Sequence, residues 1–238
     1  MVVNDLGSRV DGSEASSDAA DGVVAEIRAA GGEAVANYDS VSTPEGGAAI
    51  VGAAVAAFGR LDIVVNNAGI LGDAAFKNMT PERVDAVLDV HLRGAFHVLM
   101  PAWSVLREQN YGRVINTTSG SGLFGNFSSA AAAQAATVVE VYPIAKSAVE
   151  ALTRQLALEL GPSGIRLNAI GPGFTLTEGS AHAYEGDSQD KRAQMVPLRR
   201  IGTPTDIADA VGFLVSEQAS YISGQILFVD GGLTAPSR

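Results

Sequence analysis

Tyr142 and Lys146 are the residues of this chain whose types and spacing are best suited to chemistry. Residues four apart lie on one face of a helix, so the ammonium of Lys146 can stabilise the phenolate of Tyr142. Tyrosine normally titrates near ~10, and a lower pKa makes it a usable acid or base near neutrality. Ser119 ends a strand-like run and can hydrogen-bond a substrate carbonyl or hydroxyl. An exposed helix face has the same spacing, so the surrounding elements must decide.

Strand-like and helix-like segments alternate along the chain, and the strands are solid apolar runs. This pattern predicts one α/β domain over residues 1–238, a doubly wound parallel sheet with helices on both faces. Ligands bind at the carboxyl ends of the strands in such sheets. The polar or glycine-rich residues at these ends are Asp5, Asp39, Asn66 to Gly69, Ser119 and Pro172-Gly173. Their convergence on one edge predicts a ligand site.

Apolar runs and turn signals set the expected elements. Strands are expected at 2–3, 33–38, 61–65, 114–118, 165–170 and 225–229, with one interrupted or two successive helices over 81–109. Threonine followed by proline marks three helix starts, at Thr43, Thr80 and Thr203. Pro143 disfavours helical dihedrals at Tyr142, so the helix that ends at Leu160 is expected to begin at the proline.

Composition excludes several classes of function. With 47% apolar and 18% charged residues, the 238-residue chain is typical of a compact globule. A net charge of -10 argues against a nucleic-acid or anionic-membrane partner. The chain has no cysteine, hence no disulfide or thiolate metal site, and its three histidines lack metal-ligand spacing. We see no signal peptide and no apolar span, and we expect a cytoplasmic protein.

Four motifs in order carry a family resemblance. They are Asn66-Asn67-Ala68-Gly69, Ser119 with Tyr142 and Lys146, Asn168 to Gly173 with Thr177, and Ile222 to Gly232. Together they resemble the short-chain dehydrogenase/reductase superfamily over nearly the whole chain, which implies a Rossmann-like fold. The front half resembles the hydroxyacyl-CoA dehydrogenase part of multifunctional β-oxidation enzymes. The back half resembles oxoacyl-carrier-protein reductases, so the two halves indicate different carriers for the substrate.

The resemblance implies a role for each catalytic candidate. Tyr142 would donate or accept the proton at the substrate oxygen while a nicotinamide exchanges hydride with the attached carbon. Lys146 would lower the pKa of the tyrosine and bind the nicotinamide ribose, and Ser119 would hold the oxygen. His91 stands where many members carry an asparagine that holds a water in the proton relay. A relay role and simple packing beneath the site both remain open for this histidine.

The resemblance also implies a cofactor site. The residues along the cofactor would be Asn67, Ala68 and Gly69, with Asp39 at the adenine and Pro172, Gly173 and Thr177 beside the nicotinamide. Asp5 would accept from the adenosine ribose hydroxyls and repel a 2'-phosphate, which favours NAD over NADP.

Each of these residues also has a purely structural interpretation. Asp5 can shape its own turn, Asp39 can simply terminate a strand, and Ser119 can cap a helix. Asn67 can satisfy backbone groups at a strand end, and Thr177 can be an ordinary loop residue.

The chain departs from the family at its start and before Tyr142. It begins where the second strand is expected, so the glycine-rich turn that approaches the pyrophosphate is absent. Without the first strand, the central sheet would contain a slot, and this defect would be costly because the net stability of a protein is only ~5–15 kcal/mol. We therefore expect a fragment or a misplaced start of a longer chain. Ser119 and Tyr142 are 142 - 119 = 23 positions apart, where the family uses about a dozen. The excess, Ser128 to Val141, is either an outward loop or a strand-like addition at 137–141.

The sequence therefore predicts an NAD(H)-dependent oxidoreductase that interconverts a secondary alcohol and a ketone, including a 3-hydroxyacyl or 3-oxoacyl thioester. The alternative is a catalytically silent binding or assembly protein of the same fold. The partner is a small molecule, and residues 174–198 resemble a substrate-covering loop. By family analogy we expect a homodimer or homotetramer, formed through the helices near 81–109 and 143–160.

Overall fold

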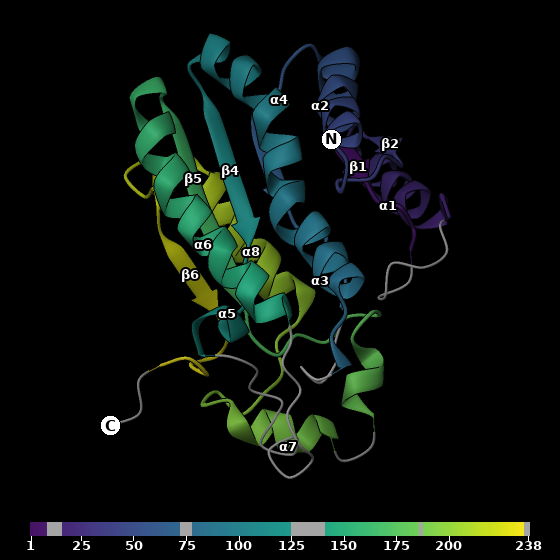
Figure 1. Ribbon diagram of the computed structural model, residues 1–238, viewed down its shortest axis with the longest axis vertical. Helices are drawn as coiled ribbons and strands as arrows, with labels where there is room; N and C mark the ends of the chain where they lie inside the picture. Colours follow the sequence, from purple (N-terminus) through teal and green to yellow (C-terminus); the bar gives the residue numbers. More distant parts are fainter. Residues whose placement is uncertain (9–15, 72–77, 125–140, 186–187, 236–238) are drawn as a thin grey trace.

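Two parallel sheets form the frame of the protein (Figure 1). The computed structural model describes residues 1–8, 16–71, 78–124, 141–185 and 188–235. The smaller sheet pairs β1 (Val2–Asn4) with β2 (Val35–Asn37). The larger sheet has the order β3-β4-β5-β6, formed by Ile63–Asn66, Gly112–Thr117, Ile165–Pro172 and Ile226–Val229. Every pair is parallel, which confirms the predicted α/β class.

The division into two sheets agrees with the slot that the sequence predicts where the first strand of the family is missing. In the part of the chain that the structure describes, β1 pairs only with β2, and β3 pairs only with β4. Helix α2 (Pro44–Phe58) connects the two sheets because it packs against β1, β2 and α4 (Gly94–Gln109). The smaller sheet is therefore held to the molecule by helix packing.

Most of the remaining helices begin and end close to the expected signals, whereas α5 (Gly120–Phe124) and α7 (Ser188–Met195) were not expected as helices. The others are α1 (Asp18–Ala29), α3 (Pro81–Leu88), α6 (Val141–Leu160) and α8 (Pro204–Val215). All three Thr-Pro starts are confirmed, because the threonine hydroxyls of Thr43, Thr80 and Thr203 accept backbone N–H groups of the first turn. Short turns of 3₁₀ helix cover Gly161–Ser163, Ala181–Tyr184 (η5) and Glu217–Ala219.

The segment 81–109 is two helices joined by one π-helical turn, η2 (Asp89–Arg93). A π turn widens the helix and is often found at functional sites. His91 lies in its middle and is buried.

Helix α6 corrects the expected start at Pro143. It begins at Val141, so both Tyr142 and Lys146 are helical. The first turn needs no intrahelical N–H bond, so a proline there costs the helix nothing. The other interpretations of the insert concern residues 128–140, which lie outside the described part of the chain.

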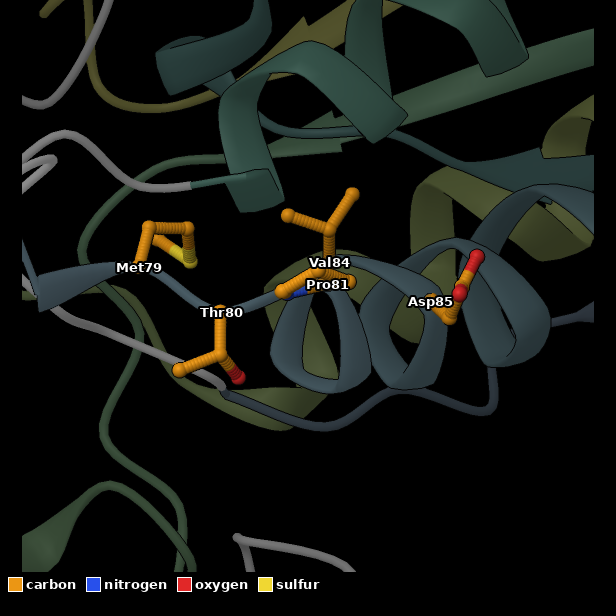
Figure 2. A pocket seen from close by; sticks show the side chains of 5 residues that line it. All are labelled: Met79, Thr80, Pro81, Val84 and Asp85. Carbon is orange, nitrogen blue, oxygen red and sulfur yellow. The ribbon is translucent and has the colours of Figure 1, made fainter.

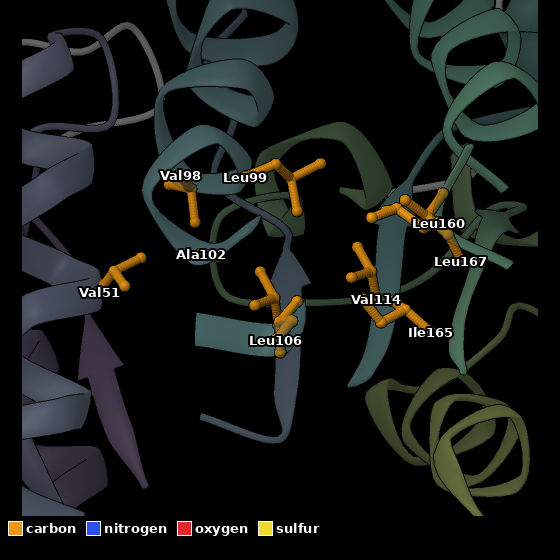
Figure 3. Close-up of a cluster of buried hydrophobic side chains, with 10 residues drawn as sticks. Val51, Val98, Leu99, Ala102, Leu106, Val114, Leu160, Ile165 and Leu167 are labelled. Atoms are coloured by element: carbon orange, nitrogen blue, oxygen red, sulfur yellow. The ribbon is translucent and has the colours of Figure 1, made fainter. Parts of the chain in front are cut away.

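The main core lies between the larger sheet, α2, α4 and the end of α6 (Figure 3). It consists of Val51, Val64, Val98, Leu99, Ala102, Leu106, Val114, Leu160, Ile165 and Leu167. On β4 the neighbour of Val114, Ile115, packs instead into a second cluster with Leu214 of α8. Alternate residues of one strand thus face helices on opposite sides, as expected for a doubly wound sheet. None of the described helices is long and apolar enough to cross a bilayer.

Candidate active site

Tyr142 and Lys146 meet at the start of α6. The Lys146 Nζ lies 5.4 Å from the centroid of the Tyr142 ring and donates a 2.6 Å hydrogen bond to the carbonyl of Thr117 at the end of β4. Only 3% of Lys146 is exposed, and burial lowers its pKa from 10.5 to about 8. At neutral pH the side chain is therefore mainly an ammonium, held between a strand end and the tyrosine ring.

Ser119 follows β4 and is half-buried. Its Oγ accepts from the backbone N–H of Ser121 at 3.2 Å and from the Ser121 hydroxyl at 2.9 Å. This is the capping interaction that the sequence left open. Both bonds use Ser119 as the acceptor, so its own O–H is still able to donate to a ligand oxygen.

Helix α5 brings Ser119 close to α6. The Ser147 hydroxyl contacts the carbonyls of Gly122 and Pro143. A Cβ on Gly122 would lie 3.2 Å from the Ser147 backbone nitrogen and 3.3 Å from Glu150 Oε1, which is tight packing. The lengthened connection between Ser119 and Tyr142 therefore does not separate the two elements that carry them.

His91 packs directly against Tyr142. The two rings meet edge to face with centroids 5.0 Å apart. The His91 Nε2 lies 2.8 Å from the carbonyl oxygen of Ile70 and 3.2 Å from its backbone nitrogen. Burial, reinforced by the charge of Lys146, lowers the pKa of His91 to about 4, so the imidazole is neutral at physiological pH. Its Nδ1 is buried without a hydrogen-bond partner among the described residues.

The ends of β3 and β4 are joined by side-chain amides, of which the sequence reasoning missed Asn116. Asn66 donates to Asn116 Oδ1 at 2.9 Å, and Asn116 donates to Thr153 Oγ1 of α6 at 3.0 Å. The Thr117 hydroxyl donates to Asn67 Oδ1 at 3.1 Å. A polar Asn116 inside an otherwise apolar strand was the available signal, since a buried amide needs partners.

The glycine at the end of β3 is in close contact with His91. A Cβ on Gly69 would lie 2.5 Å from His91 Cε1, so only glycine fits this arrangement. Gly173, after β5, is equally restricted because a Cβ would lie 2.6 Å from the backbone of Asp230. Both glycines therefore allow close packing within the protein at the edge where ligands of parallel sheets bind.

Three predicted cofactor residues lie apart from this cluster. Asp5 and Asp39 belong to the smaller sheet, where Asp5 accepts from the N–H of Gly7 at 2.6 Å and Asp39 accepts from Asn37 at 2.7 Å. Thr177 forms a local turn with Ser180. Each shows the structural interaction that the sequence allowed as an alternative.

A hollow of about 470 Å³ lies at the start of α3. It is lined by Met79, Thr80, Pro81, Val84 and Asp85. Figure 2 shows Met79 and Val84 pointing to the same side, away from Thr80. Met79, Val84 and Tyr142 all pack against one small buried cluster, so the hollow and the tyrosine share the same apolar support.

Residues 3–234 match the family model described as enoyl-(acyl carrier protein) reductase. The chain belongs to the short-chain dehydrogenase/reductase family. This confirms the predicted family and identifies the protein as an oxidoreductase that interconverts a secondary alcohol and a ketone with a nicotinamide cofactor. Enzymes of this family act on small-molecule substrates.

The relatives of this short-chain dehydrogenase/reductase agree with both halves of the resemblance. A short-chain type dehydrogenase/reductase of Mycobacterium tuberculosis is 51% identical over 98% of this chain and 73% of its own length. The peroxisomal hydratase-dehydrogenase-epimerase of Neurospora crassa is 40% identical over the whole chain, which spans only 24% of that relative. A 3-oxoacyl-[acyl-carrier-protein] reductase of Staphylococcus epidermidis is 36% identical over 92% of this chain and 85% of its own.

Solved structures give the same fold. A gluconate 5-dehydrogenase from Burkholderia cenocepacia, in complex with NADP and tartrate, superimposes with a TM-score of 0.84 at 26% identity. The match covers 99% of this chain and 86% of that one. In the described residues of this family member, no three histidine or acidic side chains are grouped to hold a metal ion.

Proposed function

We propose that Tyr142 is the acid and base of this oxidoreductase, protonating or deprotonating the substrate oxygen. The observation that carries the proposal is the buried ammonium of Lys146, 5.4 Å from the centroid of the tyrosine ring. A positive charge at this range favours the phenolate over the phenol, and burial strengthens the effect by excluding water. In ketone reduction the phenol gives its proton to the forming alkoxide; in alcohol oxidation the phenolate takes the hydroxyl proton.

Ser119 holds the substrate oxygen in this scheme. Its O–H can donate to that oxygen because its hydrogen bonds with Ser121 use it as acceptor. A donor placed where negative charge develops stabilises the transition state more than the ground state.

The residues at the strand ends fit a nicotinamide cofactor. Asn67 is fixed by Thr117, and Gly69 and Gly173 hold the chain close to His91 and Asp230 at the same edge of the sheet. The candidates to hold the cofactor are Asn67, Ala68, Gly69, Pro172, Gly173 and Thr177 near the larger sheet and Asp5 and Asp39 at the smaller one. When bound, the nicotinamide supplies or accepts the hydride; Lys146 can donate to its ribose.

We propose NAD as the preferred cofactor. Asp5 is an exposed carboxylate at the carboxyl end of β1, where it can accept from ribose hydroxyls and would repel a 2'-phosphate. The measurement is the ratio of dissociation constants for NADH and NADPH. Asp5→Asn should reduce the preference for NADH about tenfold, because one repulsive charge is removed.

His91 supports Tyr142 by position rather than by carrying a proton. A pKa of about 4 leaves the imidazole neutral throughout the physiological range, and its Nε2 is already bonded to Ile70. We therefore propose the packing role, in which His91 fixes the orientation of the Tyr142 ring and the chain after β3.

The relatives and the hollow at the start of α3 support the substrate class. One relative is named as a 3-oxoacyl-[acyl-carrier-protein] reductase, and another as a hydratase-dehydrogenase-epimerase. Met79 and Val84 line the hollow with apolar atoms and pack against the same buried cluster as Tyr142, which suits the carbon chain of an acyl group. We propose 3-oxoacyl and 3-hydroxyacyl thioesters as substrates.

A homodimer or homotetramer is the proposed assembly. Met100 on α4 is 69% exposed and Leu158 on α6 is 75% exposed, and Phe96 lies one helical turn before Met100. Large apolar side chains at such exposure are typical of surfaces that another chain covers.

The experiment that tests the catalytic proposal is Tyr142→Phe. With acetoacetyl-pantetheine and NADH, turnover should fall by about 10²–10⁴-fold, the typical contribution of acid and base catalysis. NADH affinity, followed by nicotinamide fluorescence and the quenching of Trp103, should change less than threefold. The matched control is Tyr221→Phe, because Tyr221 is fully exposed and should retain full activity.

Two results would contradict the proposal. Unchanged turnover in Tyr142→Phe would remove the tyrosine from its assigned role. No saturable NADH signal up to millimolar concentration would instead favour the catalytically silent alternative for this chain.

A further inference from the structure

An arginine of α7 lies between two aromatic rings in the segment that follows β5. The guanidinium carbon of Arg192 is 4.9 Å from the centroid of Tyr184 and 5.5 Å from the centroid of Phe174. Tyr184 is only 9% exposed; burial raises its pKa, and the charge and hydrogen bond of Arg192 partly oppose that rise. The three side chains come from α7, from η5 and from the chain directly after Gly173. Their stack therefore joins residues 174–198, here called the covering segment, to the end of the larger sheet.

This stacking leaves the arginine arranged for an anion. The rings lie beside the guanidinium, which also hydrogen-bonds Tyr184; a guanidinium has five N–H donors, so this bond leaves others for a ligand. A planar fork of donors matches the oxygens of a phosphate or carboxylate, and pre-ordering by the rings reduces the entropy lost on binding.

Arg192 lies in a segment of mixed charge. Lys191, Arg192, Arg199 and Arg200 follow Glu185, Asp187 and Asp190 in the sequence. Arg200 is neutralised by Asp206 through two 2.7 Å contacts. Among the described carboxylates, none lies within ion-pair distance of Arg192.

Helix α7 lies at the end of the sheet where ligands of parallel sheets bind. Figure 1 shows α7 beyond the carboxyl ends of the strands, separate from the start of α6. A group bound on α7 is therefore held by a different element from the one that carries the reactive tyrosine. Thioester substrates have an anion away from the reacting carbonyl, because pantetheine links the acyl group to a phosphate.

We propose that Arg192 binds a phosphate of the carrier group of the thioester substrate and so determines specificity for phosphorylated carriers. This inference rests on the proposed function, since it names the part of the same substrate that the covering segment recognises. The phosphate shared by coenzyme A and acyl carrier protein is the one attached to pantetheine.

Three thioesters that share the acetoacetyl-pantetheine part test the proposal; the second adds the pantetheine phosphate, and the third adds the remaining adenosine nucleotide of coenzyme A. They are acetoacetyl-pantetheine, acetoacetyl-4'-phosphopantetheine and acetoacetyl-CoA, each assayed by NADH consumption. Arg192→Gln should raise KM about tenfold for the phosphorylated substrates, with kcat nearly unchanged, and leave acetoacetyl-pantetheine unaffected. An equal loss for both phosphorylated substrates identifies the pantetheine phosphate; a loss for the CoA ester alone identifies a phosphate specific to coenzyme A.

Arg192→Lys and Arg107→Gln are the comparison variants. Arg192→Lys keeps the charge without the planar fork, so an intermediate KM is expected. Arg107 also lies over an aromatic ring, 5.8 Å from the centroid of Trp103, but on α4. Arg107→Gln should leave all three KM values unchanged.

Other outcomes overturn the inference. Equal loss for all three substrates would make the arginine a structural clamp, and weaker NADH binding would assign it to the cofactor. If the wild-type protein reduces none of the thioesters, the proposed function fails. Calorimetric titration with coenzyme A then decides the role of Arg192 separately, because the inference requires saturable binding that Arg192→Gln weakens about tenfold.

Discussion

The imidazole of His91 is surrounded by three different segments of the chain. Ile70 contacts its Nε2, the Tyr142 ring meets its edge, and the charge of Lys146 acts on it from α6. Protonating this ring would place a second positive charge beside Lys146 in a buried site. A residue in this position contributes by shape and by one hydrogen bond, and its protonation is unfavourable.

The low pKa of His91 predicts how folding stability changes with acidity. In the unfolded chain the histidine titrates near 6.5, and in the fold near 4, so between these values the unfolded state binds more protons. Stability must therefore fall as the pH drops from 6.5 to 4, by up to roughly 3 kcal/mol from this group. Urea unfolding of wild type and His91→Asn across this range should show a flatter slope for the variant. Parallel curves would mean that His91 is protonated in the fold.

At the scale of elements, the end of β3 fits against η2 through a single glycine. Gly69 leaves no space for a Cβ beside His91, so strand end, π turn and tyrosine are packed as one unit. A displacement of β3 is therefore transmitted to the Tyr142 ring.

Gly69→Ala should destabilise the protein by roughly 1–3 kcal/mol, the usual cost of overpacking, and should lower kcat. Removing the ring in Gly69→Ala/His91→Ala should make the double variant more stable than the sum of the single effects predicts. Gly52→Ala is the control, since a Cβ there meets nothing within 4 Å and alanine favours helix by roughly 0.5–1 kcal/mol. Additive effects of Gly69→Ala and His91→Ala would refute the contact.

At the scale of the whole molecule, the two sheets differ in how firmly they are held. Strand β4 has neighbours on both sides and five consecutive buried residues, whereas every residue of β1 and β2 is only partly buried. Amides of β1 and β2 should exchange with solvent through openings at least ~2 kcal/mol easier than those of β4 and β5. Hydrogen exchange with mass spectrometry measures this difference; equal protection would show that the two sheets unfold as one unit.

The exposed apolar side chains on α4 and α6 predict the behaviour of the assembly. Light scattering should give a multiple of the 24.4 kDa chain mass, and Met100→Lys with Leu158→Lys should shift it toward the monomer. Val23→Lys is the control, because Val23 is also exposed and apolar but lies on α1. An unchanged mass in the double variant would place the interface elsewhere.

Local signals were sufficient to predict most elements from the sequence. Some signals act over only a few residues and can therefore be recognised in the sequence alone. They are the Thr-Pro starts, the glycine after α2 and the apolar runs of β3 to β6. The start of α6 was wrong by two residues because the preference before proline is weak at the first turn of a helix. The slot in the sheet was expected from the missing first strand, but the residue-by-residue pairing on each side of it was not, since pairing depends on strands far apart in the sequence.

The sequence by itself determined the fold class, the family and the pairing of Tyr142 with Lys146, because helical spacing and motif order are local properties. Only the tertiary structure decided what surrounds that pair. Long-range packing buries Lys146 against Thr117, places the His91 ring against Tyr142, and stacks Arg192 on Phe174 and Tyr184. These contacts join residues that are distant along the chain, and the burial that shifts the pKa of Lys146 exists only when the strands and helices are assembled.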